Sequence, residues 1–447
     1  MNMLLRNIIL PRRVLFNTCI NTKRTLASNN NKNILYSWGD GTLGQLGHGK
    51  FEVTQGIFES SYVQIEPKKV SIPQSFSKIA VGDGFTLGIC AITNSLYGWG
   101  QGEVVGIKEN DKPGTLTAEP RIIPLPSNDI KIIDVVAGLK HAAVIDSNGL
   151  LYTWGNNGSW MDGGGQLGHN STTSYNKPEL VKACVEYDIK VKSVSCGASH
   201  TLILTQDNEV LSFGVGEFGR LGLGSSDDAL TPTPIDTLAD LKVKQIVASG
   251  NHSMVLTSSG SIYTWGKNNM GQLGHSDSYV ELHSMEEYPR LVESEVLSKY
   301  TIKSIAASKG RSAALTECGQ LILWGNKLSH VPSIIDKSFF DNLKIIMIAL
   351  GGKDGKSVTT AVTEDGSLWT FGDSNSKILG RKASMTGKNP EPTRVSSLKN
   401  KKVVDVICGP GIRLIISSLV YINSNQYYIF NRTTYGGFSR TIKNETK

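Results

Sequence analysis

The sequence predicts an all-β fold: a seven-bladed β-propeller of four-stranded blades, closed by pairing of strands from the N- and C-terminal ends of the chain. Two repeated elements lead to this prediction. A short strand ending in Trp-Gly or Phe-Gly occurs seven times, 47 to 61 residues apart. Between successive copies lies a pair of strands around a tight glycine turn. Strand groups that recur at such a period are typical of propeller blades.

The Trp-Gly element alternates apolar and polar residues before its glycine, as a half-buried strand does. Its copies are LYSWG at 35–39, LYGWG at 96–100, LYTWG at 151–155, VLSFG at 210–214, IYTWG at 262–266, LILWG at 321–325 and LWTFG at 368–372. Because the aromatic residue recurs at one place in the repeat, we expect it to form blade core. We number the blades one to seven in the order of these copies.

The second element supplies the other strands of each blade. Its clearest copies are VVAGLKHAAVIDSNG at 135–149, VSCGASHTLILTQDNE at 194–209 and IVASGNHSMVLTSSG at 246–260. Each copy predicts a strand, a glycine turn and a second strand, followed by a hairpin turn into the next Trp-Gly strand. Several copies follow a short, proline-rich extended segment, such as EPRIIPLP at 119–126.

The order of the elements predicts how the ring closes. The first Trp-Gly copy has no strand pair before it, and the last pair, near residues 403–418, has no Trp-Gly copy after it. Pairing the two would complete one blade from both ends of the chain. This would also remove free sheet edges, which favour aggregation. We therefore expect the propeller to span residues 33–420.

A loop of the form G-x-x-G-Q-L-G-H follows several Trp-Gly copies, most clearly at 39–49 and 266–276. Together with the Trp-Gly and Gly-x-x-His elements, it resembles the regulator-of-chromosome-condensation repeat family over about residues 34–418. Nuclear members of that family are guanine-nucleotide exchange factors for a small GTPase and bind chromatin. Organellar look-alikes are associated with mitochondrial RNA processing, ribosome assembly or respiratory-complex biogenesis. The resemblance thus implies a partner-binding propeller.

The repeat accounts for the residues whose types would otherwise suggest a catalytic, cofactor or metal site. Two G-x-G-x-x-G stretches, 39–44 and 214–219, lack the following helix that a dinucleotide site requires. Six histidines recur at two repeat positions, so they spread around a ring instead of converging on a metal: His48, His169, His275, His141, His200 and His252. We expect each to form a hydrogen bond within its own blade. No catalytic residue, cofactor or metal is predicted, and the protein is not expected to be an enzyme.

Residues 1–32 predict the compartment. They hold six of the 46 Lys and Arg residues and no Asp or Glu, a composition typical of a mitochondrial transit peptide. The alternative is a basic leader that is not a targeting signal. The remaining chain has 40 basic and 39 acidic residues, which argues against a basic nucleic-acid-binding domain. No stretch predicts an integral membrane segment. We expect a mitochondrial protein, in the matrix or associated with the inner membrane.

Blade three breaks the repeat with GNNGSWMDGGGQLGH at 155–169, whose loop is five residues longer than that of blade one. A large apolar side chain between glycines on such a loop is a candidate partner contact. The candidate partner-binding residues are Asn156, Asn157, Trp160 and Asp162. The alternative is that Trp160 folds back over its blade. In family members with exchange activity a wedge inserted in one blade engages the GTPase, and this glycine-rich insert does not match that wedge.

The second break is basic. Residues 381–402 carry seven Lys or Arg and a single acid. The candidate basic contacts are Arg381, Lys382, Lys399, Lys401 and Lys402. The tail at 421–447 interleaves aromatic with basic residues, a combination that can stack on bases. These features leave RNA open as a partner, the alternative being a solvated face with a loosely packed end.

Two functions follow for this propeller. The first is a non-catalytic protein-interaction scaffold in mitochondria, acting in organellar RNA and ribosome biogenesis or in respiratory-complex biogenesis. Its partner would be a mitochondrial ribosome or an assembly factor. The second is a guanine-nucleotide exchange factor for a small GTPase.

Overall fold

The computed structural model describes residues 34–49, 62–70, 75–105, 116–159, 163–276, 284–326, 328–352, 357–372, 378–382, 389–409 and 412–418. The predicted leader at 1–32 and tail at 421–447 lie outside the described residues. Within the described residues, no helix has the length and apolarity needed to cross a membrane.

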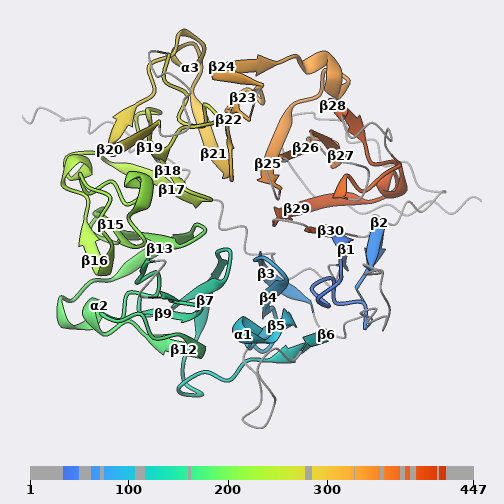
Figure 1. The fold of residues 1–447 in the computed structure, drawn as a ribbon. Helices are drawn as coiled ribbons and strands as arrows, with labels where there is room; N and C mark the ends of the chain where they lie inside the picture. The colour runs from blue at the N-terminus through green and yellow to red at the C-terminus, as the bar shows by residue number, and fades with distance from the viewer. Residues whose placement is uncertain are drawn as a thin grey trace, which may run out of the picture.

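The described chain forms seven four-stranded antiparallel sheets, which stand around a common axis (Figure 1). The predicted all-β propeller is confirmed. Six sheets each come from one stretch of chain, and the seventh, blade one, combines the two ends of the chain.

The strands of blades two to four are β3 (Phe76–Val81), β4 (Phe85–Cys90), β5 (Leu96–Gln101), β6 (Leu116–Ile122); β7 (Ile132–Ala137), β8 (His141–Asp146), β9 (Leu151–Gly155), β12 (Tyr175–Leu180); and β13 (Val191–Cys196), β14 (His200–Thr205), β15 (Val210–Gly214), β16 (Ala229–Pro234). Those of blades five to seven are β17 (Val243–Ser249), β18 (His252–Thr257), β19 (Ile262–Lys267), β20 (Met285–Leu291); β21 (Ile302–Ser308), β22 (Arg311–Thr316), β23 (Leu321–Gly325), β24 (Ser329–Ile335); and β25 (Ile345–Gly351), β26 (Val358–Thr363), β27 (Leu368–Gly372), β28 (Asn389–Arg394).

Blade one closes the ring. Its sheet has the order β2-β1-β30-β29, with the bounds β2 (Val63–Lys69), β1 (Ile34–Asp40), β30 (Ile412–Ser418) and β29 (Lys402–Cys408). β1 pairs with β30 in antiparallel register, from Ile34 opposite Ser417 to Gly39 opposite Ile412. The predicted pairing of N- and C-terminal strands is therefore confirmed.

The two ends of the sheets differ in what they carry. The first strand of each sheet lies nearest the axis and the fourth lies outermost (Figure 1). We call the end where hairpin turns join the second and third strands the hairpin face, and the opposite end the loop face. Loops after the third strands lie on the loop face and include α1 (Gly102–Val105) and η1 (Glu217–Gly219). Links between blades lie on the hairpin face and include α2 (Lys182–Glu186), η2 (Asp236–Leu238), α3 (Glu295–Ser298), η3 (Lys337–Phe340) and η5 (Ser396–Leu398).

The recurring aromatic residue forms the blade core, as predicted. The tryptophans of blades one, two, three, five and six are all 0% exposed. Four of them also tie their blade to the one before it, because each indole Nε1–H donates to a loop carbonyl there. Trp265, for example, donates to the Arg220 carbonyl of blade four at 3.0 Å. Burial and this cross-blade bond together explain why the position favours Trp.

The histidines divide into two groups. Those of the QLGH loop bond within their own blade as expected; His275 Nε2 lies 3.1 Å from Thr264 Oγ1. For the strand-pair histidines the same expectation was wrong. His200 Nε2 reaches Ser253 Oγ of the next blade at 2.9 Å, since its ring faces that neighbour. His141 and His252 likewise bond to hydroxyls one blade onward.

Candidate interaction site

The blade-three insert contains a short β-hairpin on the loop face. β10 (Gly158–Ser159) pairs with β11 (Gly163–Gly164). Both Gly158 and Gly163 have positive φ, 79° and 76°. A Cβ added at Gly158 would lie 2.1 Å from the Gly163 carbonyl oxygen. The glycines of the insert are thus needed for close approach of its two arms.

One carboxylate fixes the base of this hairpin to blade four. Asp228 accepts from the Gly164 N–H through Oδ2 and from the Gly216 N–H through Oδ1, both at 2.9 Å. Hydrogen bonds to an ionised acceptor are stronger than neutral ones. The hairpin is therefore held between two blades.

Asn157 is a structural residue of the loop, and its predicted contact role is wrong. Its side chain is 0% exposed. Its Nδ2 donates to the Ser171 carbonyl at 2.7 Å and its Oδ1 accepts from the Leu167 N–H at 3.0 Å. Asn268 of blade five is also buried and accepts in the same way from the Leu273 N–H at 3.1 Å. Both loops need a buried amide to satisfy backbone groups, so no amide remains for a partner.

Asn156 is partly buried at the entrance to the hairpin. Its Oδ1 accepts from the Gly158 N–H at 2.9 Å, and its carbonyl accepts from Gln166 Nε2 at 2.8 Å. Trp160 and Asp162, at the tip between β10 and β11, lie outside the described residues. Their contact role stays a prediction.

Arg381 takes the place of the QLGH histidine in blade seven. Thr370 Oγ1 donates to the Leu379 carbonyl at 2.7 Å, as Ser37 Oγ does to the Leu46 carbonyl before His48. Arg381 Nη2 then donates to the Thr370 carbonyl at 3.1 Å, and burial lowers the guanidinium pKa. This side chain is directed into the blade, which argues against a role as a surface contact.

The structure does not gather the remaining basic candidates in one place. Lys382 is exposed in the loop after β27, on the loop face. Lys399 and Lys402 are exposed beside η5 and at the start of β29, on the hairpin face. Lys401 is partly buried there, with Nζ 5.3 Å from the centroid of the Tyr36 ring. The three lysines therefore lie on the face opposite the insert.

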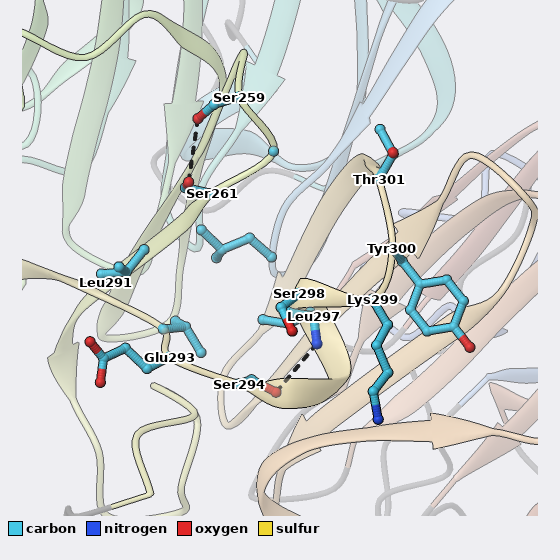
Figure 2. A pocket seen from close by; sticks show the side chains of 13 residues that line it. Ser259, Ser261, Leu291, Glu293, Ser294, Leu297, Ser298, Lys299, Tyr300 and Thr301 are labelled. Carbon is cyan, nitrogen blue, oxygen red and sulfur yellow. Dashed lines mark hydrogen bonds between the residues drawn. The ribbon is translucent and has the colours of Figure 1, made fainter.

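A shallow groove on the hairpin face joins blades five and six (Figure 2). Six of its 13 lining residues carry a hydroxyl group, and the four serine hydroxyls take part in hydrogen bonds within the protein. Ser294 Oγ accepts from the Leu297 N–H at 3.4 Å to cap α3, and Ser259 Oγ bonds Ser261 Oγ at 3.3 Å. The groove thus lies beside the hairpin turn of blade five and the link that contains α3.

Among the described residues, no group of three His, Cys, Asp or Glu side chains is placed to hold a metal ion. The five described cysteines are free thiols. Burial raises the pKa of Cys184 and Cys196 to about 12, which disfavours the reactive thiolate. Hydrogen bonds to Thr316 lower the pKa of the exposed Cys318 thiol.

These blades, with their Trp-Gly strands and QLGH loops, define a propeller of the chromosome-condensation class. The family described as RCC1-like domain matches residues 13–331, and the Regulator of chromosome condensation (RCC1) repeat matches residues 365–416. The chain belongs to the RCC1-like domain family.

Two relatives and one solved structure illustrate the match. The ultraviolet-B receptor UVR8 of Arabidopsis thaliana is 28% identical over 361 residues, which is 78% of this chain and 74% of the receptor. The mitochondrial RCC1 domain-containing protein RUG3 of Arabidopsis thaliana is 31% identical over 300 residues, 65% of this chain but only 61% of RUG3. Prp20p of Saccharomyces cerevisiae shares the fold, with a TM-score of 0.73 at 20% identity, covering 88% of this chain and 93% of Prp20p.

Proposed function

We propose that this protein is a non-catalytic interaction scaffold of mitochondria, which serves organellar RNA and ribosome biogenesis or respiratory-complex biogenesis. The observation that carries the proposal is the anchored hairpin of blade three. A tip containing Trp160 and Asp162 starts from a base that Asp228 fixes across two blades. A contact held on a rigid base costs less ordering entropy when a partner binds.

Two observations support the compartment. The leader at 1–32 has the composition of a transit peptide. The relative RUG3 is named as a mitochondrial protein. A fluorescent fusion of the full chain is expected to co-localise with mitochondria and lose that location when the leader arginines are replaced. A purely nuclear signal would contradict the proposal.

The scaffold role is tested by capture of partners from purified mitochondria with the full chain. We expect a ribosomal or assembly-factor partner that Trp160→Ala weakens about 10-fold or more, because central aromatic contacts dominate interface energies. Tyr187→Ala is the matched control, since this aromatic is 75% exposed on the hairpin face. Equal loss with both variants, or with neither, would remove the insert from the proposal.

A second candidate is guanine-nucleotide exchange on a small GTPase. It is favoured by the shared fold with Prp20p, whose structure was described together with binding to Gsp1p and histones. The full chain should then speed release of labelled GDP from a mitochondrial GTPase, and Trp160→Ala should abolish the acceleration. A scaffold without exchange activity would leave the release rate unchanged.

A further inference from the structure

We propose that the groove between blades five and six binds a lysine side chain of a partner protein, presented on an extended and partly apolar segment. The groove has a volume of about 510 Å³, within the range of about 300–1,000 Å³ that is typical of ligand-binding clefts. It lies on the hairpin face, whereas the blade-three insert lies on the loop face. The inference therefore goes beyond the proposed contact of the insert, and the two can fail separately.

At three other joints between blades, a lysine of the protein itself covers the hairpin turn. Each turn has a glycine with positive φ, and the first strand of the next blade begins at or directly after a lysine: Gly149 with Lys190, Gly319 with Lys344, and Gly366 with Lys402. A Cβ added at Gly366 would lie 2.6 Å from Lys402 Cγ, and one at Gly149 would lie 3.3 Å from Lys190 Cβ. Lys344 Cγ occupies the same place over Gly319. The stem of a lysine thus fills the space above these glycines.

The joint between blades five and six has the glycine but not the lysine. Gly260 has a φ of 92°, and Thr301 stands directly before β21. Within the described structure, a Cβ added at Gly260 would meet only the Ile302 nitrogen, at 3.9 Å. Figure 2 shows Thr301 across the groove from Ser259 and Ser261, which flank this glycine. Because the shorter side chain does not reach the turn, the place of the lysine stem is open here.

The lining of the groove suits a lysine that has apolar neighbours. Leu291 lies along one side of the groove and is 39% exposed, and Leu297 of α3 lies on the other side (Figure 2). Long cationic side chains bury their methylene stems along such apolar surface and keep the charged end in water. The exposed part of Leu291 offers further contact area to the apolar residues beside the lysine. A small free amine would leave this area uncovered.

The charge beside the groove also favours a cation. Glu293 lines the groove, Glu295 follows it in α3, and both are exposed. Neither carboxylate forms an ion pair within the described part of the chain. Lys299, the C-cap residue of α3, extends away from Thr301 (Figure 2). Two carboxylates against one ammonium group attract a basic segment and disfavour an acidic one.

The test uses the full chain with ¹³C-labelled Leu methyl groups, titrated with a capped synthetic peptide, Gly-Leu-Lys-Leu-Gly, and followed by NMR. We expect the methyl resonances of Leu291 and Leu297 to shift and to saturate. Thr301→Lys places a lysine of the protein over Gly260, as at the other three joints. It should weaken binding of the peptide about 10-fold or more, because a tethered competitor acts at a high effective concentration.

Two further variants control for the fold and for the place of binding. Thr301→Ser leaves the groove open and should bind the peptide as the native chain does. Lys344→Thr removes the stem over Gly319 and should create a second groove of the same kind, so that peptide binding gains a second class of site at blade six. Equal binding by the native chain and by Thr301→Lys would place the peptide elsewhere and overturn the proposal.

Variants of the peptide test the chemistry of the ligand. Peptides with norleucine or glutamate in place of lysine should bind much more weakly, and equal shifts with either would overturn lysine as the recognised residue. Cadaverine carries the amine and the stem without the flanking apolar residues. Binding of cadaverine as tight as that of the peptide would assign the groove to small amines instead of a protein segment. The absence of any saturable shift at Leu291 and Leu297 would overturn the groove as a binding site.

Discussion

Three buried histidines are each held in one tautomer by a hydroxyl of the next blade. Ser253 Oγ donates its single hydrogen to the Arg220 carbonyl at 2.8 Å. It must therefore accept from His200 Nε2–H, which leaves Nδ1 unprotonated. Thr201 and Ser312 donate in the same way to loop carbonyls and so accept from His141 and His252. These rings are neutral links between blades.

Neutral burial predicts a pH-dependent stability. Burial lowers the pKa of His141 and His252 to about 4, and burial with the nearby Arg220 charge lowers that of His200 as well. The unfolded chain, with an ordinary His pKa near 6.5, binds more protons below that pH. The free energy of unfolding should hence be maximal above pH 6.5. It should fall by about 1.4 kcal/mol per unit for each histidine as the pH drops toward 4.

Urea titrations at pH 7.5, 6 and 5 measure this slope. His252→Gln keeps an N–H donor but does not titrate. It should therefore reduce the dependence of the unfolding free energy on pH by the contribution of one histidine, about 1.4 kcal/mol per pH unit. An unchanged slope would show that His252 is protonated in the folded protein or that other groups dominate the acid response.

Residues at which the repeat changes are harder to predict than the repeat itself. Arg381 is directed into its blade and not to the surface, and the Leu-Gly before it, which aligns with the LGH of other blades, is the sequence signal for that position. Asn157 is buried, in contrast to its predicted contact with a partner. Its buried amide donates to the carbonyls of residues 171 and 173. No local sequence pattern predicts that the chain folds back to bring those carbonyls to Asn157.

At the scale of the element, the outer strands show how the edges of the blades are protected. Ring closure leaves seven fourth strands at the rim. Each contains a proline next to the register shift opposite the Trp or Phe of its blade: Pro67, Pro120, Pro178, Pro232, Pro289, Pro332 and Pro392. Proline has no N–H to offer another strand, and bulges twist an edge away from pairing.

Restoring N–H groups at the rim should therefore promote self-association. We expect the triple variant Pro232→Val, Pro289→Val, Pro332→Val to remain folded at low concentration but to aggregate faster, because three neighbouring blades gain continuous edge donors. Light scattering over time at several protein concentrations measures the effect. The same three positions changed to Ala, with lower β-propensity, serve as a comparison. Aggregation no faster than that of the native chain would assign the prolines to strand geometry alone.

The elements themselves were largely predictable, for a physical reason. Alternation and glycine turns are local properties of each blade. Because they recur seven times, the copies together identify the strands even where a single copy is weak. The hairpin β10–β11 was not predicted, because its strands are two residues long and depend on Asp228, 64 residues beyond Gly164.

At the scale of the whole molecule, closure of the ring changes how the blades share stability. In an open array each repeat contacts only its neighbours, and the terminal repeats are free to fray. Here the sequence order alone implied that blade one draws strands from both ends, and pairing of β1 with β30 bears this out. A closed ring has no terminal blade, so no blade is weaker because of its place in the chain.

Cavities made at equivalent positions in blade one and in blade five should consequently lower the free energy of unfolding by equal amounts. Trp38 and Trp265 are both 0% exposed, and their indole N–H groups donate to the preceding blade at 3.2 and 3.0 Å. Replacement of either by Ala should cost about 3–5 kcal/mol, the usual range for a buried large side chain. Urea unfolding should give one transition in each case. Amide exchange in blade three, which is two blades away from both Trp38 and Trp265, should accelerate to the same extent for both variants. Fraying confined to blade one in Trp38→Ala, with blade three still protected, would mean that the β1–β30 seam opens independently and that the propeller behaves as an open array.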